Sequence, residues 1–373
     1  MAAVTDHKIR LACPDLGEEE IDAVARVLRT PVLTNGPETE AFEDEFADLH
    51  LARFGVAFAN GTVALSAILA GLGIGPGDEV IVPSLTFVSS ATSILHVGAT
   101  PVFADVHPDT FNLDPTDSAK RVTRRTKAIM AVHYAGQPAD LEQLADLAAS
   151  AGVALVEDAA QAHGATYHGA PVGTWGAASM FSFTPTKNIT TGEGGMVLTG
   201  DEDLARKLRL LRNHGQSAPY LHTLVGFNWR ITEMQAAIGR VQVAKLPAIL
   251  ARKQVVTAQL DNLLDAVPGV QPPFVAARRS HVHMLYTVKL DGGAAVRDSA
   301  IGSLAERGVE AKVYFPPVHR QPIFSAAGVD LPVTEDLAGR ILSLPAHSKL
   351  SSHEVVSVAS AMAEVVGATA VMP

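Results

Sequence analysis

The sequence contains a single cysteine, Cys13, and few aromatic residues, which make up 5% of its 373 positions. One cysteine excludes an intrachain disulfide and a metal centre built from several thiolates. The longest apolar stretch, residues 63–74, is interrupted by Ser and Gly and is shorter than the about 20 residues that span a bilayer. Residues 1–20 carry Asp and Glu where a secretory signal has an apolar run. These absences predict a soluble cytoplasmic protein.

Positive charge is also scarce. The 29 Lys and Arg residues are outnumbered by 39 Asp and Glu residues, which gives a formal net charge of −10. Nucleic-acid binding needs a positive surface, so we do not expect it as the main role. A short basic run at residues 121–127 is interpreted as a solvated helix face. Hydrophobic residues make up 47% of the chain, enough for a large core of helices packed on a sheet.

Short and long apolar segments alternate along the first half of the chain. The short ones, rich in Val, Ile and Ala, predict buried strands, and the longer ones predict helices. Strands are expected at residues 55–59, 79–83, 100–106, 126–133 and 154–157, and helices at 18–28, 38–51, 60–72, 87–97 and 139–151. Repeated strand–helix–strand units with continuous apolar strands predict a mostly parallel sheet covered on both faces.

The pattern changes after residue 178. Short strands are expected at 179–183, 194–200 and 284–290, and helices at 202–213, near 300–307 and at 353–366. A long helical zone covers residues 231–264, and we expect Pro247 to interrupt it. The sequence therefore predicts a large α/β domain over residues 1–247 and a smaller α+β domain over residues 248–373.

Candidate site residues follow the predicted strands, because ligands of an open parallel sheet bind beyond the carboxyl ends of its strands. Gly61 and Thr62 open a predicted helix after Asn60, which fits either a plain N-cap or a phosphate site. Asp158 follows an apolar strand. A carboxylate in this position is either an N-cap or a buried group that needs a cationic or N–H partner.

A loop with several hydroxyl side chains and a glycine-rich exit, residues 182–195, carries one lysine, Lys187. It lacks the spacing of a Walker loop, which leaves a phosphate contact or an imine with a carbonyl compound. Lys187 and Asp158 together match pyridoxal phosphate, which needs a lysine for its Schiff base and a carboxylate opposite its ring nitrogen. Gly61, Thr62 and Ser182 are candidates for its phosphate cup, and Phe87 for its aromatic face.

At this level of detail the chain resembles the DegT/StrS-type nucleotide-sugar aminotransferases over nearly its whole length. The matching segments include LTNGPETEAFEDEFA (33–47), VEDAAQAHGA (156–165), MFSFTPTKNITTGEGGMV (180–197), FNWRITEMQAAIG (227–239) and VYFPPVHRQPIF (313–324). The resemblance implies the type I fold of PLP-dependent transferases, with pyridoxal 5'-phosphate as the cofactor.

The resemblance also implies residue roles. Lys187 corresponds to the Schiff-base lysine and proton shuttle, Asp158 to the partner of the pyridinium nitrogen, and Gln161 to a contact of the ring hydroxyl. Other matches are Phe87 for ring stacking, Gly61, Thr62 and Ser182 for phosphate contacts, and Tyr314 and His319 for the sugar-nucleotide entrance. Asn228 matches an asparagine that reaches the phosphate from the neighbouring subunit, which implies a homodimer with shared active sites.

The implied reaction moves an amino group from an amino-acid donor, with glutamate expected, to a nucleotide-linked ketosugar. A 4-keto-6-deoxyhexose aminated at C4 is the leading substrate, from the GEGG segment (192–195) and the short chain. A 3-keto sugar and a non-nucleotide keto-sugar or cyclitol are the alternatives. Dehydratases of the family carry histidine in place of the lysine, so Lys187 favours amino transfer.

Two other classes of protein compete with the transaminase. One is a non-catalytic regulator that binds the same cofactor, which the joint presence of Lys187, Asp158 and Gln161 disfavours. The other is a metal hydrolase built on His281 and His283, whose spacing puts them on one face of a strand. No suitable carboxylate is near in sequence, so we expect exposed strand histidines and no metal. His163 is expected to pack or orient near the cofactor.

Overall fold

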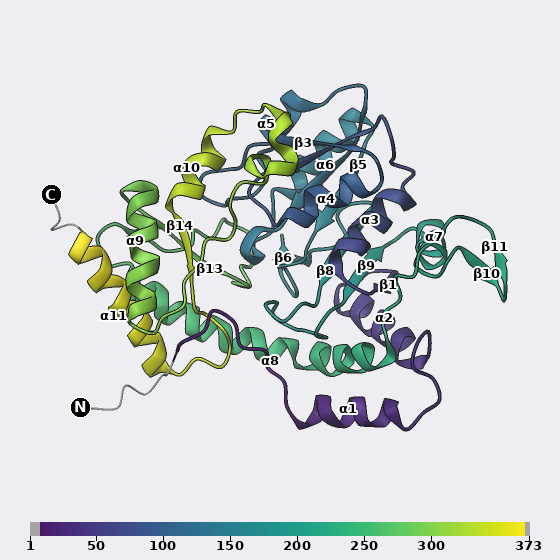
Figure 1. Cartoon of the computed structure of the whole chain (residues 1–373), viewed down its shortest axis with the longest axis horizontal. Helices are drawn as coiled ribbons and strands as arrows, with labels where there is room; N and C mark the ends of the chain where they lie inside the picture. The colour runs from purple at the N-terminus through teal and green to yellow at the C-terminus, as the bar shows by residue number, and fades with distance from the viewer. Residues whose placement is uncertain (1–7, 370–373) are drawn as a thin grey trace.

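The computed structural model describes residues 8–369 and centres on a seven-stranded sheet between two layers of helices (Figure 1). The strand order is β1-β9-β8-β5-β4-β2-β3, with four parallel pairings and two antiparallel ones that involve β9. The strands are β1 Phe54–Phe58, β2 Glu79–Pro83, β3 Thr100–Ala104, β4 Thr126–Val132, β5 Ala154–Asp158, β8 Ala178–Ser182 and β9 Gly195–Thr199. The predicted α/β fold with a mostly parallel sheet is confirmed.

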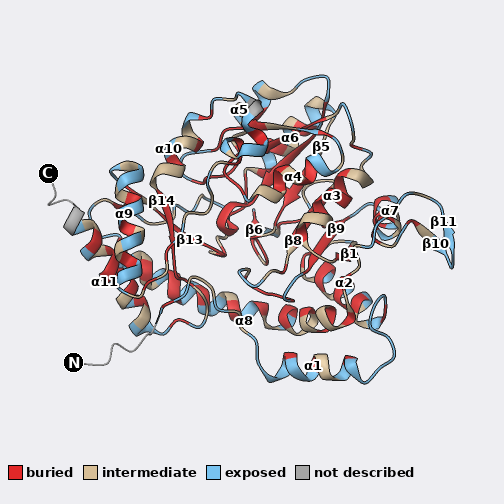
Figure 2. Ribbon diagram, in the orientation of Figure 1, coloured by how far each residue is buried: buried red, intermediate tan, exposed pale blue. Residues whose placement is uncertain are grey.

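Strand alternation explains why both faces of this sheet are buried (Figure 2). In β2, Ile81 packs into one hydrophobic cluster while Val80 and Val82 pack into the other, since neighbouring strand residues face opposite sides. The first cluster receives α2 Pro37–Leu49, α6 Leu141–Ala151 and α8 Glu233–Leu264. The second receives α3 Gly61–Gly71, α4 Val88–His96 and α7 Glu202–Arg212. The continuous apolar strands of the sequence are thus fully used.

Most expected elements of the first half lie within two residues of the observed ones, and α1 Glu18–Leu28 and β2 match fully. The interpretation of residues 121–127 as a helix face is wrong. Helix α5, Pro115–Arg121, ends at the first of them, and β4 begins at Thr126. Within this run Arg125 forms an ion pair with the buried carboxylate of Glu79.

The expected interruption at Pro247 is also wrong, because α8 continues through it for 32 residues. Pro247 lies on the exposed side of the helix, where its ring displaces no packed neighbour. Val243, Leu246 and Ile249 on either side of it are buried against the sheet layer and hold both halves in line. Packing of an apolar stripe here outweighs the hydrogen bond that proline removes.

Helix α8 leads into a lobe at the left of Figure 1, built on a three-stranded antiparallel sheet. Its elements are β12 Val270–Gln271, β13 Tyr286–Leu290, β14 Ile341–Leu344, α9 Gly293–Glu306, α10 Pro332–Arg340 and α11 Ser352–Thr369. The lobe has its own hydrophobic cluster, which also includes Ile9 and the end of α8. A division into domains 1–247 and 248–373 stays a prediction. No helix of the described residues is long and apolar enough to cross a membrane.

Candidate active site

A cavity of about 630 Å³ lies at the carboxyl ends of the parallel strands. It is lined by the start of α3, the segment before and into α4, the end of β5, the end of β8 and the loop that follows it. Its walls include seven residues expected to bind or react with the cofactor: Gly61, Thr62, Phe87, Asp158, Gln161, Ser182 and Lys187. Tyr314 also lines it. Folding therefore brings together residues that are up to 253 positions apart in sequence.

Lys187 lies on the loop between β8 and β9, where its backbone N–H donates to the Thr184 carbonyl at 3.0 Å. Burial lowers the pKa of its amine to about 8, although the nearby Asp158 carboxylate raises it. A lower pKa leaves a larger share of the amine unprotonated near neutral pH. An unprotonated amine can attack a carbonyl carbon or accept a proton, so Lys187 can perform both tasks.

Asp158 is the last residue of β5 and is buried, but few groups bind it. Its Oδ2 accepts a hydrogen bond from Ser90 Oγ at 2.7 Å, and its Oδ1 accepts one from the Ala160 N–H at 3.2 Å. Burial raises the pKa of this carboxyl, against the lowering effect of Ser90, Ala160 and Lys187. A buried carboxylate with spare acceptor capacity at a cavity wall is suited to a ligand N–H.

The preceding residue, Glu157, faces the opposite side of the sheet. Unlike Asp158, its carboxylate is fully hydrogen-bonded within the protein. Its carboxylate accepts from the backbone N–H groups of Gly173, Trp175 and Gly176 and from His133 Nε2. Burial by itself raises the pKa of Glu157, but these bonds, His133 first, hold it below its ordinary value. Glu157 has no spare capacity, so its role is to hold the loop at 173–176 against the sheet.

The start of α3 fits a phosphate group. A Cβ on Gly61 would lie 2.9 Å from Met180 Sδ and 3.1 Å from Ser182 Cβ, so only glycine allows this close approach. Asn60 caps the helix by accepting from the Val63 N–H, and Thr62 Oγ1 lies 2.7 Å from Ser89 Oγ. Helix N-termini present N–H groups and partial positive charge to anions.

Two further side chains match the ring of the expected cofactor. The Phe87 side chain is 52% exposed although it lines the cavity, and its ring centroid is 5.7 Å from that of Phe315. Gln161 Oε1 accepts from the Ala135 N–H at 2.7 Å, which fixes the amide at the wall. An exposed aromatic face, an under-bonded carboxylate, an amine and a helix N-terminus around one cavity together fit pyridoxal phosphate.

Two expected site residues lie elsewhere. Asn228 is exposed, pairs with Asn213 in an isolated bridge, and does not line the cavity of its own chain. His319 is buried outside the cavity. Its Nδ1 lies 2.6 Å from Ser84 Oγ and its Nε2 lies 3.0 Å from Glu335 Oε1. These two partners hold the imidazole outside the cavity.

The histidine expectations have mixed outcomes. His281 and His283 are not exposed strand residues, because they lie in the loop before β13, partly buried, with ring centroids 3.9 Å apart. Among residues 8–369 no group of three or more His, Cys, Asp and Glu side chains could hold a metal ion. His163 packs as expected, fully buried against the rings of Phe181 and Phe183.

The sequence pattern did not indicate the hydroxyl side chains of Thr86, Ser89 and Ser90, which also line the cavity. These residues follow β2 at its carboxyl end, the same signal that pointed to Gly61 and Asp158. Met284 and Phe315 were missed too, because Met284 lies in the loop before β13 and Phe315 lies in the segment between α9 and α10, both far in sequence from the strands that carry the site.

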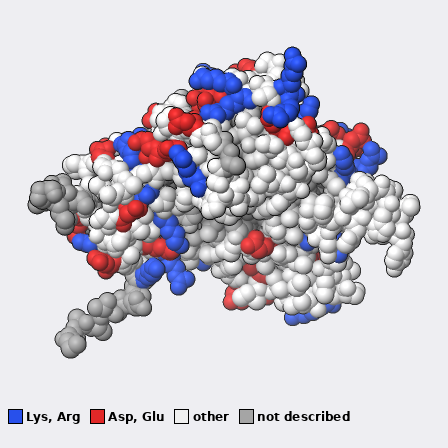
Figure 3. All heavy atoms as spheres, turned by 45° about the horizontal axis from the view of Figure 1, so that its top comes forward, with Lys and Arg blue, Asp and Glu red and all other residues white. Residues whose placement is uncertain are grey.

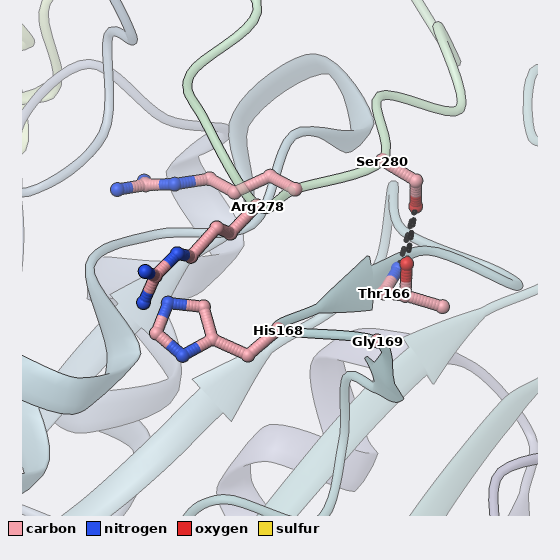
Figure 4. A pocket seen from close by; sticks show the side chains of 6 residues that line it. Thr166, His168, Gly169, Arg278 and Ser280 are labelled. Atoms are coloured by element: carbon pink, nitrogen blue, oxygen red, sulfur yellow. Dashed lines mark hydrogen bonds between the residues drawn. The ribbon is translucent and has the colours of Figure 1, made fainter.

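A second depression, of about 590 Å³, lies beside the hairpin of β6 Thr166–Tyr167 and β7 Ala170–Pro171 (Figure 4). It is lined by Thr166, His168, Gly169, Arg278, Arg279 and Ser280. None of the expected site residues contributes to it. Arg279 is already bound to Asp140 and to the Pro138 carbonyl, so its charge is used within the fold. The first cavity is therefore the candidate active site.

Comparison with known proteins agrees with this geometry. Residues 14–363 match the DegT/DnrJ/EryC1/StrS aminotransferase family. The chain belongs to this family. GDP-perosamine synthase of Caulobacter vibrioides is 41% identical over 96% of this chain and 98% of its own. The dTDP-3-amino-3,4,6-trideoxy-alpha-D-glucose transaminase of Streptomyces venezuelae is 40% identical over 95% and 94%. A pleiotropic regulatory protein of Geobacillus stearothermophilus is 39% identical over 94% and 95%.

Solved structures of the family share the fold. DesV of S. venezuelae, in complex with a ketimine intermediate, superposes with a TM-score of 0.90 at 40% identity and covers 94% of each chain. The protein Spr1654 of Streptococcus pneumoniae in its PLP form superposes with a TM-score of 0.93 at 28% identity, over 97% of this chain and 99% of its own. The protein is thus an aminotransferase of the type I fold, as its sequence segments implied.

Proposed function

We propose that this aminotransferase binds pyridoxal 5'-phosphate in the cavity and moves an amino group from glutamate to a nucleotide-linked ketosugar. The observation that carries the proposal is the pairing of Lys187 and Asp158 in one cavity of about 630 Å³. One side chain is an amine with a lowered pKa, and the other is a buried carboxylate with spare acceptor capacity. A relative solved in a PLP form supports the choice of cofactor.

Each wall of the cavity has a task in holding the cofactor. Lys187 would bind its aldehyde carbon, Asp158 its ring nitrogen and Gln161 its ring hydroxyl, while Phe87 would cover the ring. Gly61, Thr62 and Ser182 would receive the phosphate at the start of α3. When bound, the cofactor supplies an electron sink for the bond that breaks at the donor's α-carbon.

The proton chemistry falls to Lys187. When its amine is free, Lys187 would take the proton from the donor's α-carbon and give it to the carbon that carried the cofactor's aldehyde group. A pKa of about 8 suits an amine that must both accept and release a proton near neutral pH. Asp158, if ionised, would stabilise a protonated ring nitrogen of the bound cofactor and so its capacity to accept electrons.

For the acceptor we propose a nucleoside-diphosphate 4-keto-6-deoxyhexose, aminated at C4. Relatives named for GDP- and dTDP-linked sugars support the nucleotide sugar. A 3-keto sugar is the second candidate, favoured by the relative named for a 3-amino sugar. Tyr314 at the cavity wall is the proposed substrate contact. His319 lies outside the cavity, so we place no substrate contact on it.

The experiment follows the visible absorbance of the cofactor-loaded protein. Adding glutamate should bleach the lysine-bound cofactor, and a ketosugar nucleotide added afterwards should restore the band. A panel of 4-keto and 3-keto sugars with different nucleotides then ranks the acceptors. Absence of any visible band would contradict cofactor binding, and a band that no donor bleaches would favour a regulator, the role named for one relative.

We further propose a homodimer in which Asn228 reaches the partner's cavity. The hairpin of β10 Gln216–Ala218 and β11 Leu221–His222 projects at the right of Figure 1, and residues 213–229 contain no charged Asp, Glu, Lys or Arg. Figure 3 shows this projecting tip with uncharged side chains only. Tyr220 is 94% exposed there, and Val225 and Phe227 are also exposed. Such an apolar arm on a single chain indicates a surface that a second copy covers.

Complementation tests the shared site. Lys187→Ala and Asn228→Asp should each inactivate the homodimer, the second because its carboxylate repels the phosphate. Coexpression should restore about a quarter of wild-type activity, since half of the dimers are mixed and each has one intact site. Activity that stays at the level of the single variants would contradict a shared site.

A further inference from the structure

Asp158 accepts few hydrogen bonds, so each donor has a large influence on the charge and orientation of its carboxylate. Among the described residues, the only side chain that donates to it is Ser90, whose Oγ lies 2.7 Å from Oδ2. Ser90 is buried on the first turn of α4. The one other partner of its hydroxyl among the described residues is the hydroxyl of Thr86. The charged or titratable groups that face Asp158 are Lys187 and His133.

The direction of the bonds follows from donor and acceptor capacity. An ionised carboxylate only accepts, so the Ser90 proton points at Asp158. Ser90 Oγ is then an acceptor, and Thr86 Oγ1, 2.8 Å away, must be the donor. Thr86, Ser90 and Asp158 thus form a chain of hydrogen bonds with one direction, and all three residues are buried. Each bond of such a chain polarises the next and favours the ionised carboxylate.

The start of α4 contacts both ends of the site. Ser89 Oγ lies 2.7 Å from Thr62 Oγ1, at the phosphate end, while the next residue, Ser90, binds Asp158, at the ring end. Neighbouring residues on a helix point about 100° apart, which lets one turn reach both places. The helix therefore fixes the spacing between the helix N-terminus and the carboxylate.

We propose that Ser90 is a positioning residue that keeps Asp158 ionised and oriented toward the ring nitrogen of the bound cofactor, with Thr86 as its support. The proposal rests on the proposed function, because it assigns the use of Asp158. Ser90 itself touches neither the donor nor the acceptor. Its effect should appear in the protonation of the cofactor ring and in turnover, and much less in substrate affinity.

The test compares Ser90→Ala with Ser90→Thr and with Ser93→Ala. Ser93 is a matched control, since it is buried on the same helix but its hydroxyl donates to the Ser90 backbone carbonyl. In Ser90→Ala we expect a kcat lower by about ten- to a hundredfold, as for loss of a hydrogen bond to a charged group, with KM within about twofold. The pH titration of the cofactor absorbance should shift in the same variant. Ser90→Thr should keep both kcat and this titration near their wild-type values, and Ser93→Ala should change neither of them.

A readout without cofactor separates this inference from the proposed function. In the apoprotein, loss of the Ser90 bond leaves the buried carboxylate with one N–H donor. We therefore expect the fall in stability that Asp158 causes with rising pH to extend further toward neutral. Should Ser90→Ala not fold, Thr86→Val offers the same change in milder form. Wild-type protein without a cofactor band would contradict the proposed function. A normal wild-type band with Ser90→Ala indistinguishable from wild type, or with Ser93→Ala equally impaired, would overturn the role of Ser90 alone.

Discussion

Two lysines with lowered pKa values meet at the loop after β8: Lys187 lies on the loop, and Lys253 lies on α8 and binds the loop at Asn188. Lys187 faces the large cavity with Asp158 nearby. Lys253 on α8 is 7% exposed, and its Nζ donates to Asn188 Oδ1 at 2.8 Å. Burial lowers the pKa of Lys253 to about 7, and no carboxylate of residues 8–369 forms an ion pair with it. The space beside it is only about 20 Å³.

The difference shows that a lowered pKa alone does not mark a reactive lysine. Both amines are uncharged more often than a surface lysine, but only Lys187 has room for a ligand and a carboxylate in the same cavity. Lys253 instead anchors Asn188, the residue after Lys187, and lies near His281, His283 and His347, whose pKa values are all lowered. This contrast supports our proposal that Lys187 is the reactive lysine, while Lys253 holds the loop that carries it.

The largest expected effect separates the two lysines directly. Lys187→Ala should lower kcat by about 10⁴-fold or more, since it removes the proton carrier. Lys253→Met should lower it by less than about tenfold, because the loop loses a single hydrogen bond. Steady-state transamination of both variants, with cofactor content measured in each, makes the comparison. Equal losses in the two variants would break it.

A second expected effect concerns the two carboxylates of β5. Asp158→Asn should lower kcat by about 10²- to 10³-fold and yet stabilise the apoprotein by about 1 kcal/mol near neutral pH, because it removes a buried, poorly bonded charge. Glu157→Gln should instead destabilise it by about 2 kcal/mol, since the amide cannot accept the bonds from both His133 and the loop N–H groups. Urea unfolding of the two variant apoproteins measures these changes in unfolding free energy, which should have opposite signs.

These signs depend on pH in a defined way. The folded-state pKa of Asp158 is raised, so wild-type stability falls as the pH rises from the unfolded-state pKa through the folded one. The folded-state pKa of Glu157 is lowered, so its contribution is present above the unfolded-state pKa and is lost on acidification. Variants whose stabilities change in the same direction at neutral pH would contradict the contrast.

The last expected effect concerns stability alone and is a slope against pH. The folded-state pKa of Lys253 is about 7, well below that of an unfolded lysine, so deprotonation favours the folded state as the pH rises from 7 toward 10. Lys253→Met should remove up to about 1.4 kcal/mol per pH unit of this rise. Unfolding free energies at three pH values in this window measure it, with Lys245→Met, a more exposed lysine on the same helix paired with Glu19 and Glu20, as the control.

Much of the fold and the centre of the site followed from the sequence because their signals are local. Continuous apolar strands predicted the sheet. Asp158 ends a strand, and Gly61 and Lys187 lie in the segments that follow two others, so all three reach the cavity. The continuation of α8 through Pro247 could not be predicted from the sequence, because it depends on packing against elements that are distant in the chain.

The roles of Ser90, Lys253 and His319 could not be predicted either, because they too depend on groups that are distant in sequence. Ser90 acquires a role only through a carboxylate 68 positions away, and Lys253 through an amide 65 positions away. His319 looked like a substrate residue in its segment, but Ser84 and Glu335, brought close by folding, hold its ring outside the cavity.

The central claim is that Lys187, and not the buried Lys253, binds the cofactor. Borohydride reduction of the cofactor-loaded protein makes the linkage permanent, and peptide mass spectrometry then locates it. We expect the pyridoxyl mass on the peptide that contains Lys187 and none on the peptide that contains Lys253. A modified Lys253, or a loaded protein in which Lys187 stays unmodified, would contradict the account.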